Sequence, residues 1–211
     1  IREQLKKAER YLDDKERADE EEDYDLPEYD AKCEALIPVL EREQKAFFHA
    51  HRADDIFTAI RIAKEFKLDY VIVHCTEGHL VRDILAAEKV KAIAGPILCD
   101  RSKPELKNLS VEGPALLHEA GIHAALCTDH PVIPIQYLPL CAGLCMGAGL
   151  EREEALKAIT IYAAEAAGID DKVGSLAPGK DADLVIYEED ADPCGPYARP
   201  SMVFINGQQV V

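Results

Sequence analysis

Residues 46–75 of the sequence read AFFHAHRADDIFTAIRIAKEFKLDYVIVHC. Two apolar stretches, AFFHAH and LDYVIVHC, flank a segment whose apolar side chains have helical spacing. A strand, a helix and a second strand in this order predict a βα unit with parallel strands. The second stretch is almost wholly apolar, which is typical of a strand that is buried on both faces.

The same alternation continues along the chain. Two more strands are predicted by VKAIAGP and IHAALCTD, and the intervening helices by GHLVRDILAAEK, PALLHEAG and IQYLPLCAGLCMGAG. The segment LEREEALKAITIYAAEAAG predicts one further helix, which ends at Gly168. Beyond it, DADLVIYEED predicts a strand and SMVFINGQQVV a hairpin with an Asn-Gly turn. We therefore expect an α/β body over residues 1–170 and a small β module over residues 171–211.

The N-terminal part is predicted to be helical and strongly acidic. IREQLKKAERYL has the pattern of an amphipathic helix, and KCEALIPVLEREQ also has helical apolar spacing. Most of the acidic residues near the start lie between Asp13 and Asp30, which we interpret as a solvated helix end and loop. The formal net charge of the 211 residues is -16, which argues against nucleic acid or an anionic membrane as a partner.

The cysteines indicate a reducing compartment. The chain has seven of them, an odd number without a CxxC pair, so no disulfide framework is expected. Cys141 and Cys145 are spaced to share one helix face and are predicted to be small core residues. The sequence shows neither a secretory signal nor an apolar run long enough to span a bilayer. The expected location is the cytoplasm.

Three of the predicted strands end in a potential metal ligand: His49, His74 and Asp129. In a βα barrel, the carboxyl ends of the strands face a shared mouth, where functional groups gather. Imidazole nitrogen and carboxylate oxygen suit a divalent metal, zinc first, with iron or manganese as alternatives. A lone histidine at a strand end is more often structural, but three such ligands in successive units predict a site.

The two histidines of HAH require an assignment. His49 and His51 lie on the same side of a strand, because side chains alternate with period two. They could form a metal clamp on the first strand of a barrel. However, 78 residues separate His51 from Asp129, or about three βα units at roughly 30 residues each. If Asp129 ends the last strand, HAH ends the fifth.

The motifs FFHAHRADD, VIVHCTEG, LCTDHP and VGSLAPGKDADLVIY resemble the second half of the metal-dependent amidohydrolase superfamily, in its imidazolonepropionase-like branch. The likeness runs from about Lys45 to the C-terminus. The resemblance implies an α/β fold: the second half of a (β/α)8 TIM-type barrel, βα units five to eight, plus part of a small β-sandwich domain.

The resemblance also implies residue roles and a reaction. His49 and Asp129 would bind the metal, with His74 as a further ligand or as a polariser of substrate and water. Asp129 and His74 would be catalytic in hydrolysis of a carbon–nitrogen bond other than a peptide bond, in a small molecule such as a cyclic amide. The segment TDHPVIPIQ differs from the sequence expected after the aspartate of imidazolonepropionase, so that substrate is not carried over.

Other polar residues follow the ligand strands. His51, Arg52, Glu77 and His130 are predicted to contact substrate at the barrel mouth, although a salt bridge or helix cap explains Arg52, Glu77 and His130 equally well. The histidines that lie away from strand ends are interpreted as structural: His79, His118 and His123. Ser102 and Lys103 lie in a long loop that we interpret as solvated.

The superfamily has a His-x-His pair on its first strand, and no counterpart precedes His49. The N-terminal half of the barrel is therefore expected as a partner, from the same chain or another one, and a homo-oligomer is possible. The alternative is a non-catalytic half-barrel: a fragment, an assembly partner or a pseudoenzyme that retains the fold.

Overall fold

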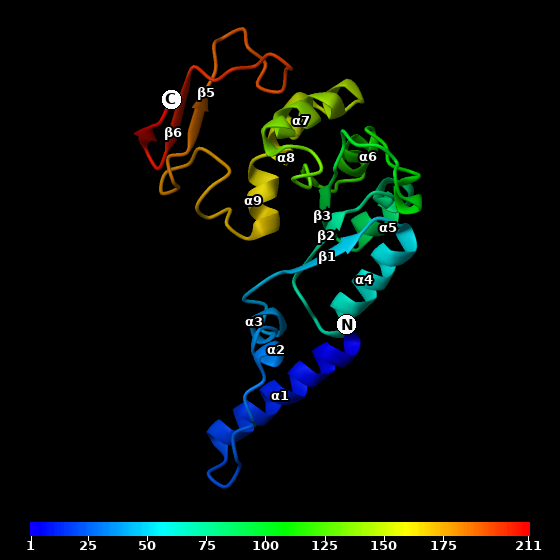
Figure 1. The fold of residues 1–211 in the computed structure, drawn as a ribbon, viewed down its shortest axis with the longest axis vertical. Coiled ribbons are helices and arrows are strands. Elements are labelled where there is room, and N and C mark those ends of the chain that lie inside the picture. Colours follow the sequence, from blue (N-terminus) through cyan, green and yellow to red (C-terminus); the bar gives the residue numbers. More distant parts are fainter. The chain divides into compact units, whose positions relative to one another are not determined.

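The computed structural model describes residues 1–211 (Figure 1). These residues group into two compact units. The first unit comprises Ile1–Phe47 and Phe57–Tyr70, and the second comprises Phe48–Ile56 and Val71–Val211. The predicted boundary near residue 170 falls inside the second unit, and it stays a prediction. None of the helices combines the length and the apolar character that crossing a bilayer requires.

The first unit is built on the long helix α1 (Arg2–Glu20), which buries Leu5, Ala8 and Tyr11. These side chains recur every three residues and so form one apolar stripe. Cys33 is fully buried against this stripe. The predicted helix around residues 32–44 is instead two single turns, α2 (Ala31–Glu34) and α3 (Ile37–Leu40). Pro38 explains the break, because it has no N–H to donate to the carbonyl group one turn earlier.

The acidic segment after α1 is solvated, as predicted. Residues 21–30 form turns and irregular chain that is mostly exposed. Asp30 ends the segment as the N-cap of α2, where its carboxylate accepts hydrogen bonds from the backbone N–H groups of Lys32 and Cys33. The same carboxylate also accepts a hydrogen bond from the Lys7 ammonium group.

The main sheet contains four strands in the order β1-β2-β3-β4. The strands are β1 (Ala46–Ala50), β2 (Tyr70–His74), β3 (Lys91–Ala94) and β4 (Ala125–Leu126). β2 pairs with β3, and β3 with β4, in parallel, which confirms the predicted parallel sheet. Val71 and Ile72 are fully buried, as expected for an apolar parallel strand. β4 is shorter than predicted.

Helices follow the strands as the alternation predicts. These are α4 (Ala53–Glu65), α5 (Arg82–Ala87) after the short helix η1 (Gly78–Val81), α6 (Gly113–Glu119) after η2 (Pro104–Leu106), and α7 (Leu138–Gly147) after η3 (Ile135–Tyr137). On α7, Cys141 and Cys145 are both fully buried, which confirms their predicted place in the core.

The prediction of one continuous helix over residues 150–168 is wrong in one respect. The structure has two helices there, α8 (Arg152–Ala158) and α9 (Ile161–Ala167). Thr160 separates them with φ −131° and ψ −95°, and its hydroxyl donates to the carbonyl of Leu156 at 2.7 Å. A β-branched hydroxyl residue can satisfy the backbone locally in this way and so compete with the continuous helix. Gly168 ends α9 in the left-handed conformation, as predicted.

The C-terminal residues form a separate antiparallel sheet of β5 (Leu184–Ile186), β6 (Met202–Ile205) and β7 (Gln208–Gln209). The predicted hairpin is confirmed, because Asn206 and Gly207 both have positive φ, as its two-residue turn requires. Apolar side chains remain exposed on this sheet, among them Val185 at 53%, Ile186 at 41% and Ile205 at 57%. Three short strands therefore leave apolar surface uncovered.

Candidate metal centre

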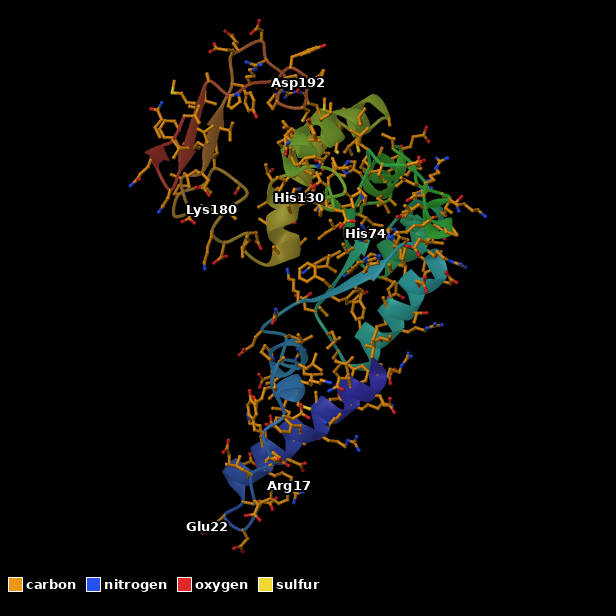
Figure 2. All side chains as sticks on the ribbon, viewed as in Figure 1. Arg17, Glu22, His74, His130, Lys180 and Asp192 are labelled. Atoms are coloured by element: carbon orange, nitrogen blue, oxygen red, sulfur yellow. The ribbon has the colours of Figure 1, made fainter.

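Three imidazole rings meet where β1 and β2 end. His49 lies in β1, His51 follows its last residue, and His74 is the last residue of β2. The ring centroids are 4.3 Å apart for His49 and His74, 4.5 Å for His51 and His74, and 4.8 Å for His49 and His51. One nitrogen of each ring lies within 4.8 Å of the others. Figure 2 marks His74 beside these strands.

Burial favours the uncharged form of two of the rings. His51 is 6% exposed and His74 is 3% exposed, whereas His49 is exposed. The pKa of His51 is lowered to about 4, chiefly by burial and then by the neighbouring rings of His74 and His49. Burial also lowers the pKa of His74, although its hydrogen bond to Gly95 opposes this. Neutral imidazole is the form that offers a lone pair to a metal.

A backbone carbonyl fixes the orientation of His74. Its Nδ1 lies 2.7 Å from the carbonyl oxygen of Gly95. Because a carbonyl only accepts, Nδ1 carries the hydrogen and Nε2 keeps the lone pair. Position 95 requires glycine, since its φ is +131° and an added Cβ would lie 2.3 Å from the carbonyl oxygen of Cys127.

His51 has a neighbour at each ring nitrogen. Its Nδ1 lies 2.8 Å from the hydroxyl oxygen of Thr76, which is itself buried. Its Nε2 lies 3.8 Å from a carboxylate oxygen of Glu105. His51 thus has a polar neighbour near each ring nitrogen, whereas the hydrogen bond of His74 lies on its Nδ1 edge.

Asp129 follows β4 and is exposed, with a left-handed φ of 52°. It is not part of the set of three rings whose nitrogens lie within 4.8 Å of one another. Its charge nevertheless acts on His74, where it favours the protonated form. The structure thus brings His49, His51 and His74 together and places the Asp129 carboxylate within electrostatic reach of them.

The predicted substrate contacts have other partners in this structure. The Arg52 guanidinium donates two hydrogen bonds of 3.0 Å to the Asp54 carboxylate. The Glu77 carboxylate accepts from the backbone N–H of Ala53, at the start of α4, and from the Asn108 side chain, both at 2.8 Å. Glu77 therefore caps a helix and tethers a loop. His130 is exposed, and contact of these residues with substrate stays a prediction.

Glu105 is a residue near the rings that the sequence reasoning missed. It lies on η2, in the loop after β3, 3.8 Å from His51 and 3.6 Å from the ammonium group of Lys103. The length of this loop was a usable signal, because functional residues concentrate on long loops. Ser102 and Lys103 are exposed, as expected for a solvated loop, while Glu105 of the same loop approaches His51.

The chain belongs to the Amidohydrolase family, because the sequence model of that family matches residues 40–210. The matched residues include the four parallel-sheet strands and the three histidines at their ends.

Individual proteins support the same assignment. The amidohydrolase tasK of Hapsidospora irregularis is 29% identical over 188 residues, which are 86% of this chain and 19% of that protein. The imidazolonepropionase of Geobacillus kaustophilus is 49% identical over 74 residues, which are 34% of this chain and 18% of that protein. A crystal structure of an amidohydrolase from Thermotoga maritima is similar over the whole of this chain and 54% of that chain, with a TM-score of 0.93 and 40% identity. The chain thus spans about a fifth of these two curated relatives and about half of the solved protein.

Proposed function

We propose that this chain carries half of the active site of a metal-dependent hydrolase that cleaves carbon–nitrogen bonds other than peptide bonds. The substrate class is a cyclic amide or a related small amide. The observation that carries the proposal is the meeting of His49 and His74 at the ends of neighbouring strands, in a chain of the Amidohydrolase family. The sheet would form the second half of a (β/α)8 barrel, and β5–β7 would form part of a β-sandwich.

The residues fit a divalent ion, zinc before iron or manganese. His49, His74 and Asp129 would hold it, since imidazole and carboxylate are ligands that zinc prefers. The hydrogen bond from His74 to Gly95 leaves Nε2 as a lone-pair donor, which favours a ligand role for His74 over donation to an oxyanion. When bound, such an ion acidifies water and polarises the scissile carbonyl.

The protein residues would divide the remaining work. Asp129 would accept a proton from the attacking water and return it to the departing nitrogen. His51 would face the substrate rather than the ion, because Thr76 and Glu105 lie at its two ring nitrogens. His130 and the loop that carries Lys103 and Glu105 would border the substrate.

The second candidate is a non-catalytic half-barrel. It is favoured by one observation: Asp129 is not among the residues whose ligand atoms lie within 4.8 Å of one another, so the strand ends described here bring together only histidines. Pairing with the N-terminal half of a barrel would complete the site under the first proposal and would not under the second.

Metal analysis and a hydrolysis assay on the full-length natural protein distinguish the two. The proposal expects a bound divalent ion and turnover of cyclic amides that a chelator abolishes and zinc restores. If the protein is folded and fully loaded with metal but inert towards a panel of cyclic and linear amides, the hydrolase proposal is refuted. The non-catalytic half-barrel then remains as the explanation.

A further inference from the structure

We propose that His118, His123 and Glu154 form a second divalent-metal site, separate from the strand-end histidines. His118 lies on α6, His123 precedes β4 by two residues, and Glu154 lies on α8. Helices α6 and α8 are labelled in Figure 1. One potential ligand atom of each lies within 4.8 Å of the other two. His123 comes before β4 and Asp129 after it, so the two sites lie at opposite ends of that strand.

The geometry of two of these residues matches that of ligands sharing one ion. His118 Nδ1 and Glu154 Oε2 are 3.4 Å apart. Two ligand atoms at about 2.0–2.2 Å from a tetrahedral zinc ion are roughly 3.3–3.6 Å apart. In addition, His118 Nδ1 is buried and makes no hydrogen bond. A buried polar atom without a partner is costly, and an ion between the two groups would satisfy it.

Hydrogen bonds hold the Glu154 carboxylate in place. Tyr162 donates its hydroxyl to Oε2 at 2.6 Å, and Lys157 donates to Oε1 at 3.0 Å. Each carboxylate oxygen has two acceptor sites, so Oε2 can take Tyr162 and an ion together. The Lys157 charge works against a cation, but Lys157 also lies 2.8 Å from Glu153, which offsets part of it. Outer partners of this kind orient metal ligands.

Stacking holds the His123 ring. Its centroid lies 4.8 Å from that of Tyr162, with 20° between the planes, and 5.8 Å from that of His118. A cavity of about 10 Å³ is lined by His118, His123, Glu154 and Tyr162, which is about the volume that one water-sized particle needs. Because His123 is exposed, solvent can reach this cluster.

These residues define the class of ligand. Two imidazoles and one carboxylate suit zinc, with a water molecule as fourth ligand. Copper and nickel also favour imidazole. A bound ion would link α6 to α8 at the end of the sheet remote from the strand-end histidines, so its effect is expected on stability rather than on the hydrolytic step.

The direct test is anomalous diffraction at the zinc edge from crystals of the full-length protein grown with zinc. We expect a peak about 2.0–2.2 Å from His118 Nδ1 and from Glu154 Oε2. A map without a peak between these residues, at a zinc concentration that occupies other sites, would overturn the proposal and leave a hydrogen-bond network only.

Variants in solution give an independent test. After zinc loading and desalting, Glu154→Gln and His123→Ala should each hold one zinc ion fewer per chain than the wild type. Glu153→Gln is the matched control, because Glu153 lies on the same helix and contacts the same lysine but is not among the three ligands. His123→Cys should retain the ion, since a thiolate also binds zinc. Folded variants that keep the wild-type zinc content would refute the site. Where a variant does not fold, the anomalous map of the wild-type protein provides the test instead.

Discussion

The three histidines His49, His51 and His74 form a strand-end cluster, in which His51 and His74 lie buried against one another. Asp30 and Lys7 in the first unit instead pair at the surface. In the cluster, burial dominates and lowers the pKa of both imidazoles, to about 4 for His51. At the surface, the hydrogen bond from Lys7 dominates and lowers the pKa of Asp30 to about 2. The same protein thus keeps one set of groups neutral and another ionised, according to whether loss of water or a charged partner has the larger effect.

This contrast predicts where substitutions act. Changes in the strand-end cluster should alter chemistry and metal binding with little effect on folding. Changes to the surface pair should alter the pH dependence of stability and leave chemistry unchanged.

The largest effect is expected for Asp129→Asn. Asparagine has nearly the shape of aspartate but cannot hold a proton at neutral pH and is a poor anionic ligand. Loss of general acid–base catalysis alone is worth about 10²–10⁴-fold in kcat, and weaker metal binding adds to it. Steady-state kinetics on an amide substrate, with circular dichroism to check the fold, measures this. Near-normal turnover in the variant would remove Asp129 from the mechanism.

A smaller effect is expected for Thr76→Val. Valine fills the same volume but leaves Nδ1 of His51 without its partner. A lost hydrogen bond of about 0.5–1.5 kcal/mol corresponds to a rise in KM of roughly 2–13-fold, with the metal content unchanged. Thr76→Ser keeps the hydroxyl and is the control. If valine instead reduced the metal content and serine did not, His51 would be acting as a ligand.

The smallest effect is expected for Asp30→Asn, and it should be present near neutral pH and disappear in acid. The pKa of Asp30 is lower in the folded protein, so its ionised form contributes stability above its ordinary value of 3.8. That contribution falls as the pH drops from about 3.8 to about 2. Asparagine still caps α2 but does not pair with Lys7 as an anion. Urea unfolding should show a gap between wild type and variant at pH 6 that narrows by pH 2.5, and a constant gap would contradict this.

The features that could be predicted from sequence are those set by local chemistry. The apolar run ending at His74 gave a buried parallel strand, and Asn206-Gly207 gave the hairpin turn, because few alternatives fit those patterns. The break at Thr160 could not be read from helical periodicity, since it depends on one hydroxyl that bonds to the preceding turn.

The candidate site divides in the same way. Strand-end positions identified His49 and His74 in advance, because parallel neighbours bring their carboxyl ends together. The approach of Glu105 depends on the path of a long loop, and the meeting of His118 with Glu154 depends on how α6 packs near α8. Both are long-range results of packing, so the sequence interpretation of His118 as structural had no means of detecting its partner.

Metal analysis of His49→Ala and His51→Ala beside the wild type shows whether His49 is a metal ligand and His51 faces the substrate. The full-length protein should be loaded with zinc and desalted, and KM should be measured for each variant that retains activity. We expect that His49→Ala loses the ion of the hydrolytic site, while His51→Ala keeps it and binds substrate more weakly. Loss of the ion from His51→Ala, with His49→Ala still fully loaded, would contradict it.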